Sequence, residues 1–121
     1  MKRRLSPLPA ALIFLSAGTL HFLRPEPFLR VVPPWVGSPG WAVALSGAAE
    51  LAGGLGLLPP RTRGAASLGL VALLLAVSPV HVYMLQEPER FRPIPLWALW
   101  LRLALQPALI WYVLRVGRKG A

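Results

Sequence analysis

Polar side chains interrupt runs of sequence that are otherwise built almost entirely from apolar residues. Five of them fall inside segments whose composition suits lipid: His21, Glu50, His81, Arg102 and Gln106. Glu50 is the only charged side chain between residues 31 and 60. A charge at the centre of a membrane helix costs about 2.5–3.5 kcal/mol on insertion scales, so such groups face one another or a cavity, and a functional role is the default expectation.

The chemistry open to these five groups is proton transfer and hydrogen bonding. A carboxylate or an imidazole can take or give a proton, which makes Glu50 and His21 the candidate catalytic residues. All five are candidate ligand-binding residues, and we expect Glu50 and Arg102 to form an ion pair at the floor of a polar pocket. Two alternatives stay open: the ion pair could only fix the helix register, and each histidine could only hydrogen-bond locally. Two histidines and one carboxylate could also ligate zinc or iron, but Arg102 repels a cation, so we expect no metal site.

Helical periodicity predicts that Glu50 points into a helix bundle. On a helical projection Glu50 shares its face with small residues such as Ser46 and Gly47, whereas Trp41 and Leu45 lie on the opposite face. Small residues let neighbouring helices approach closely in lipid. The glycine-rich face, with Glu50 on it, is therefore expected to contact other helices.

The same projection predicts that Arg102 and Gln106 also point inward. They are one turn apart, and the tryptophans of that segment, Trp97, Trp100 and Trp111, fall on the other side. Tryptophans near the two ends of a membrane helix are typical anchors at the lipid–water interface. The polar pair is thus expected to face the bundle, and the tryptophans to face lipid.

The elements that would position these groups are membrane helices. The chain has 121 residues, of which 55% are apolar and only 14% charged, against about 25% charged in a soluble domain. Charge-free runs extend over residues 5–23 and 64–86, and about 20 apolar residues span a bilayer. We therefore expect an all-α, four-transmembrane-helix bundle forming a single membrane domain over residues 1–121, with helices over about 9–23, 41–58, 65–85 and 96–114.

The segment between the first two expected spans is rich in proline. Within residues 24–40, Phe28, Val31, Val32 and Trp35 recur at the spacing of one helical face. This pattern predicts a short helix on the outer membrane surface. An irregular proline loop is the alternative.

The cations predict which way the bundle is inserted. The net charge is +9, and the cations just outside the apolar runs are Lys2, Arg3, Arg4, Arg61, Arg63, Arg115, Arg118 and Lys119. The two remaining loops carry four arginines, partly balanced by glutamates. By the positive-inside rule both termini are expected in the cytoplasm of a multi-pass inner cell-membrane protein. This distribution argues against nucleic-acid binding, and cleavage of the first segment as a signal peptide is a less favoured alternative.

Several motifs resemble the DoxX-like family of small four-helix membrane proteins. They are "HFLRPEPFLRVVPPW", "SGAAELAGGLGLLPPRTR", "PVHVYML" and "WLRLALQPALIW", in that order over residues 21–111. Two positions depart from the family pattern, which usually has asparagine at His81 and proline at Ala104. The resemblance implies a four-helix membrane fold and, more loosely, a quinone-linked redox role, because the family name comes from a membrane subunit of an archaeal thiosulfate:quinone oxidoreductase.

The expected function is therefore that of a small quinone-linked redox or redox-accessory subunit, acting with a partner redox enzyme. A quinone is the expected non-covalent cofactor, with Arg102 and Gln106 donating hydrogen bonds to a carbonyl and Glu50 or His21 supplying a proton. The chain has no cysteine, so it supplies no thiolate nucleophile or cysteine-ligated metal centre. Two alternatives stay open: a non-catalytic membrane anchor or scaffold for another protein, and a small-solute or proton pathway completed by a homo-oligomer.

Overall fold

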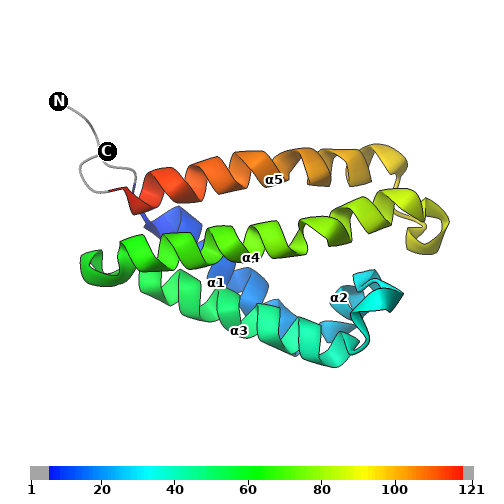
Figure 1. The fold of residues 1–121 in the computed structure, drawn as a ribbon, viewed down its shortest axis with the longest axis horizontal. Helices are drawn as coiled ribbons and strands as arrows, with labels where there is room; N and C mark the ends of the chain where they lie inside the picture. Colours follow the sequence, from blue (N-terminus) through cyan, green and yellow to red (C-terminus); the bar gives the residue numbers. More distant parts are fainter. Residues whose placement is uncertain (1–5, 119–121) are drawn as a thin grey trace.

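A computed structural model describes residues 6–118, and within that range the chain folds into helices and connecting turns, without strands. The α-helices are α1 (Leu8–Leu23), α2 (Pro25–Val31), α3 (Pro39–Leu57), α4 (Pro60–Gln86) and α5 (Leu96–Gly117) (Figure 1). Two 3-10 turns, η1 (Pro34–Val36) and η2 (Pro88–Phe91), lie in the connections. The expected all-α class is confirmed. Four cations used in the charge argument, Lys2, Arg3, Arg4 and Lys119, lie outside the described residues.

Prolines mark where several helices begin. A proline stands in the first turn of α1, α2, α3 and α4, where its fixed φ suits the helix and its missing N–H is not needed. For this reason α4 begins at Pro60, earlier than the expected start near residue 65. The α3–α4 turn is held by Arg63, which donates from Nε to the Leu57 carbonyl and from Nη2 to the Leu58 carbonyl, both at 2.7 Å.

The long helices pack in the order α1, α3, α4, α5, each mainly against the next. Glycines allow α1 and α3 to approach each other closely. A Cβ on Gly18 would stand 2.8 Å from the carbonyl oxygen of Gly47, and a Cβ on Gly47 would stand 2.7 Å from the Cβ of His21. The two backbones can come this close only because neither glycine has a side chain.

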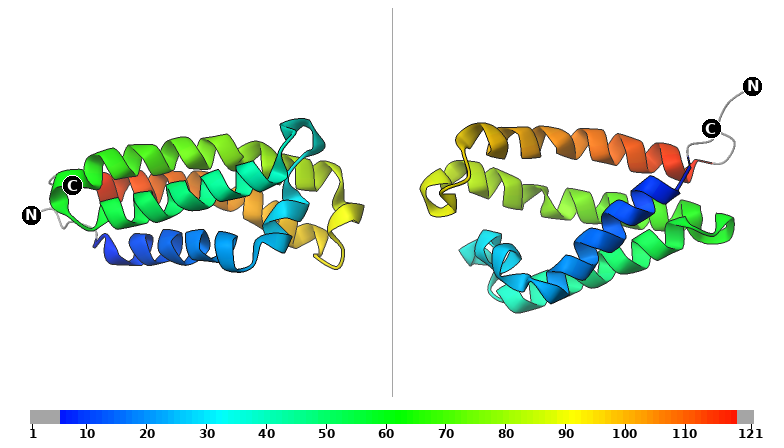
Figure 2. Two further views of the ribbon diagram at one scale, coloured as in Figure 1. Left: turned by 90° about the horizontal axis from the view of Figure 1, so that it is seen from below. Right: turned by 180° about the vertical axis from the view of Figure 1, so that it is seen from behind.

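The two pairs of helices converge at one end and diverge at the other. Figure 2 shows the α4–α5 pair and the α1–α3 pair meeting near the chain termini, with α2 lying at the opposite end. We call these the narrow end and the wide end. The buried apolar core sits at the narrow end and comprises Ala10, Ala11, Phe14, Leu57, Leu70, Leu74, Val113 and Val116. It holds together the start of α1, the end of α3, the first half of α4 and the end of α5.

Two helices, α4 and α5, are each long and apolar enough to cross a membrane. The α1–α2 pair, bent by 93° at its junction, adds a third candidate if it is one broken span. Among the described residues this supports two to three spans rather than the four expected. The reason lies in α1, which has only 16 residues, and in α3, whose glycines, serine and Glu50 lower its hydropathy.

The outward-facing sides of α3 and α5 agree with the sequence pattern. Trp41 and Leu45 on α3 and Trp97 and Trp111 on α5 are all strongly exposed. Opposite them, Val43 and Gly47 of α3 are buried, as is Gln106 of α5. The predicted inward and outward faces of these two helices are confirmed.

Candidate functional site

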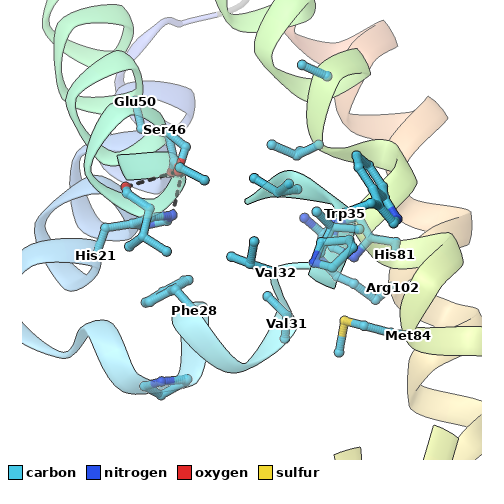
Figure 3. Close-up of a pocket in the computed structure, with 18 of the residues that line it drawn as sticks. His21, Phe28, Val31, Val32, Trp35, Ser46, Glu50, His81, Met84 and Arg102 are labelled. Atoms are coloured by element: carbon cyan, nitrogen blue, oxygen red, sulfur yellow. Dashed lines mark hydrogen bonds and ion pairs between the residues drawn. The ribbon is translucent and has the colours of Figure 1, made fainter. Parts of the chain in front are cut away.

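A cavity of about 560 Å³ lies at the wide end, between the two diverging helix pairs. Its walls come from α1, the α2–η1 segment, α3, α4 and α5. The short helix expected within residues 24–40 is present as α2. Val32 and Trp35 of the predicted face come after its end, Trp35 in η1. Phe28, Val31, Val32 and Trp35 all line the cavity, as Figure 3 shows. The periodicity thus predicted a helix, whereas the apolar face covers the cavity.

One wall of the cavity carries His21 and Glu50, which we call the dyad. His21 Nε2 lies 3.3 Å from Glu50 Oε1, and the imidazole Nδ1 lies 2.7 Å from the carbonyl oxygen of Ala17, one turn earlier on α1. Phe28 stacks on the imidazole, with the ring centroids 3.9 Å apart. The ring is therefore held on two edges and one face.

The contact with Ala17 fixes the tautomer of the imidazole. A carbonyl oxygen only accepts, so Nδ1 must carry the hydrogen in its bond to Ala17. Nε2 then faces the carboxyl group, and a proton can bridge Nε2 and Oε1 in two ways: as N–H donating to a carboxylate, or as a carboxylic acid donating to the ring nitrogen.

The opposite wall carries Arg102 and His81 (Figure 3). Arg102 Nη1 donates to Gln106 Oε1 at 2.8 Å. His81 Nδ1 is buried and has no hydrogen-bond partner among the described residues. A buried polar atom without a partner is rare and is a common mark of a site that awaits a ligand or water.

Gln106 does not line the cavity. It is buried, and its Nε2 donates to the Leu74 carbonyl at 2.9 Å and to Ser78 Oγ at 3.2 Å. Ser78 in turn donates to the same carbonyl at 2.8 Å. Both polar atoms of the amide group are thus engaged within the bundle, so the expectation that Gln106 binds a ligand is corrected: it fixes the position of Arg102.

The expected ion pair between Glu50 and Arg102 does not form. No contact within 4.0 Å joins them among the described residues, and Figure 3 shows them on opposite sides of the cavity. The packing order explains this, because α4 lies between α3 and α5, while α1 packs directly on α3. His21 of α1 is therefore the side chain in contact with Glu50. Glu50 and Arg102 lie on two opposite walls of the same cavity.

No group of three histidine, cysteine or acidic side chains in the described part of the chain lies close enough to hold a metal ion. His21 and Glu50 contact each other on one wall, and His81 lies across the cavity with Arg102 (Figure 3). The arrangement is therefore that of a hydrogen-bonding site. Its apolar walls and opposed polar groups can hold a small molecule by its head group.

The family comparison covers almost the whole bundle. Residues 10–117 match a family described as Domain of unknown function (DUF8561). The chain belongs to this family. No curated protein and no solved structure matches it.

The resemblance to the DoxX-like family is therefore wrong. The motifs that carried it consist of glycines on a packing face, inward polar residues and prolines in a loop. Any small helical bundle in lipid needs small residues for close packing and inward-facing polar groups. Such motifs are typical of the architecture and do not identify a family. The redox role that the resemblance implied therefore has no support from a family relationship.

The sequence pattern missed two features of the site. Phe28 was assigned to an apolar helix face, and nothing indicated that it would stack on His21. Ser78 was not singled out, although its hydroxyl helps to hold Gln106. Ser78 stands three residues before His81, so helical periodicity could have placed both side chains on the same face of the helix.

Proposed function

We propose that this DUF8561 protein binds a lipid-soluble amphiphile, with the head group of that molecule held in the cavity at the wide end. The observation that carries the proposal is the opposition of two polar walls inside an otherwise apolar cavity of about 560 Å³. Ligand pockets of small molecules generally have volumes of about 300–1,000 Å³, mostly apolar walls and a few convergent polar groups. Val31, Val77 and Met84 supply apolar lining suited to a tail or ring.

A quinone is the head group that we propose first. Its ring carries two carbonyl oxygens on opposite edges, and each needs a donor. Arg102 can donate to one carbonyl, and the dyad faces the other. The carboxylic acid form of Glu50 can donate to that carbonyl when it turns from His21 Nε2 to the ligand. In this arrangement the dyad is also the group able to supply a proton to a reduced ring, as general acids do.

We further propose that α1, α3, α4 and α5 all cross the inner cell membrane, with both termini in the cytoplasm. The charge distribution supports this orientation. In the sequence, eight cations flank the segments of the narrow end, of which Arg61, Arg63, Arg115 and Arg118 are among the described residues. The connections of the wide end carry four: Arg24, Arg30, Arg90 and Arg92. By the positive-inside rule the cation-rich end faces the cytoplasm, so the cavity opens toward the outer side.

Any electrons for a bound quinone would come from a partner protein, since the chain has no cysteine for an iron–sulfur centre. We therefore propose a redox-accessory role rather than an independent enzyme. If the protein only anchors its partner in the membrane, substitutions in the dyad should leave partner binding unchanged. This expectation distinguishes the anchoring role from the redox-accessory role.

Extraction of bound lipids from the purified full-length protein tests the quinone proposal. We expect a quinone in stoichiometric amount with the wild type and a reduced amount with Glu50→Gln, which removes the carboxyl group. Glu87→Gln is the matched control, because Glu87 is exposed and outside the cavity. Absence of quinone from the wild type, together with failure of added quinone to bind, contradicts the proposal.

A further inference from the structure

Arg102 has no carboxylate of the described residues beside it. Glu50 contacts His21 on one wall of the cavity, whereas Arg102 lies on the other wall. The acidic side chains of the chain all fall within the described residues: Glu26, Glu50, Glu87 and Glu89. Glu50 contacts His21, Glu89 pairs with Arg92 at 2.9 Å, and the other two are exposed. No side-chain carboxylate of the described residues forms an ion pair with Arg102.

The surroundings of Arg102 offer only neutral acceptors. Its one hydrogen bond among the described residues goes to the amide oxygen of Gln106, although a guanidinium has five N–H donors. His81 Nδ1, on the same wall of the cavity, is buried without a partner. Most of the N–H donors of Arg102, and its positive charge, are therefore without a partner among the described residues.

A half-buried cation in an apolar setting is costly unless it is paired. The groups that could pair with Arg102 are absent from the protein wall but could arrive with the ligand. Since Arg102 lacks an anionic partner among the described residues, we infer, as a refinement that depends on the proposed binding function, that the bound amphiphile carries a single oxyanion on its head group, placed against Arg102.

The geometry of the guanidinium narrows the chemical class. Its planar fork matches a planar oxyanion with two acceptor atoms, and such charge-assisted bonds are about twice as strong as neutral ones. A long-chain carboxylate meets this description, and so does a quinone ring with an ionised hydroxyl beside a carbonyl. Both present the same chemistry to Arg102, and the experiment distinguishes them.

The test compares each anion with its neutral counterpart on the full-length protein in nanodiscs. The probes are palmitate against methyl palmitate, and an alkyl-substituted 2-hydroxy-1,4-naphthoquinone against the same quinone without the hydroxyl. Binding is followed by the change in tryptophan fluorescence, which the quinones quench and the acyl probes shift by changing the surroundings of Trp35 in the cavity. Trp35→Phe identifies the part of the signal that arises there.

We expect at least one anion to bind about tenfold to a hundredfold more tightly than its neutral counterpart, the range expected for a hydrogen bond to a charged group. Arg102→Gln should abolish this preference, Arg102→Lys should keep part of it, and Arg61→Gln, at the narrow end, should leave it unchanged. The wild-type comparison alone decides the inference if Arg102→Gln does not fold.

Two results overturn the inference in different ways. If the neutral quinone binds as tightly as its ionised form, and methyl palmitate as tightly as palmitate, the oxyanion assignment is wrong while the proposed binding function stands. If none of the four probes changes the Trp35-dependent fluorescence, both the oxyanion inference and the proposed binding function are wrong.

Discussion

At the scale of single residues, the dyad depends on the contact between the imidazole of His21 and the carboxyl group of Glu50. The hydrogen bond from Nδ1 to Ala17 fixes the imidazole at 2.7 Å and leaves Nε2 in need of a partner. Glu50 is that partner, at 3.3 Å. Removing it leaves a buried nitrogen without a hydrogen bond, which costs about 1–3 kcal/mol.

This makes two substitutions of Glu50 distinguishable by stability. We expect Glu50→Leu to lower the free energy of unfolding by about 1–3 kcal/mol. Glu50→Gln should lower it much less, because the amide can donate to Nε2 in place of the acid. Chemical unfolding in detergent micelles, followed by circular dichroism, measures both values. Equal stability of the two variants would show that the His21–Glu50 contact does not support the fold.

In the proposed binding mode, Gln106 acts on the ligand only through Arg102, to which its amide oxygen is hydrogen-bonded, and is therefore a positioning residue. Gln106→Leu removes the acceptor for Arg102 and the amide donor to Leu74. We expect a loss of about 1–3 kcal/mol in the free energy of unfolding and weaker binding of palmitate. Leu105→Gln, at an exposed position on the same helix, should change neither quantity. Unchanged palmitate affinity in folded Gln106→Leu protein would mean that Arg102 needs no support.

The sequence predicted which side chains face inward but not which of them meet. Glu50 and Arg102 stand on inward faces, as the helical projection of α3 and α5 required. Their separation depends on the packing order of the helices, and local periodicity contains no information about that order. The partner of Glu50 could be identified only when α1 was seen to pack directly on α3.

At the scale of elements, glycines decide how closely α1 approaches α3, and through that distance how His21 meets Glu50. We expect Gly47→Ala to push α1 away, because its Cβ would stand 2.7 Å from the Cβ of His21. Gly69→Ala on α4 is the matched control, since nothing lies within 4 Å of its Cβ. It should stabilise the helix by up to about 1 kcal/mol. Thermal unfolding distinguishes them, and a Gly47→Ala variant as stable as Gly69→Ala contradicts the close packing.

The segment from α2 to η1 shows that an apolar helix face does not by itself indicate which surface it packs against. The spacing of Phe28, Val31 and Val32 predicted a helix, and α2 is that helix. The same spacing fits a face on lipid and a face on a cavity equally well, because both environments exclude water. The bend of 93° between α1 and α2 directs this face across the wide end.

At the scale of the whole molecule, stability and binding are placed at opposite ends. The narrow end holds the buried core, in which Leu70 is 1% exposed, and the wide end holds the cavity. We expect Leu70→Ala to cost about 2–5 kcal/mol in the free energy of unfolding, as for a leucine in a packed core. Val77→Ala should cost much less, because Val77 already borders open space. Chemical unfolding of the two variants measures this difference, and similar losses would contradict the division between the ends.

The central claim, that a lipid-soluble molecule occupies the cavity, is tested most directly by native mass spectrometry of the intact protein released from detergent. The variant Val77→Phe fills the cavity from α4, whereas Leu75→Phe, at a position 59% exposed on the same helix, adds bulk outside it. We predict a bound small molecule on the wild type and on Leu75→Phe, and its loss from Val77→Phe. A molecule retained equally by all three proteins, or bound by none, would contradict the claim.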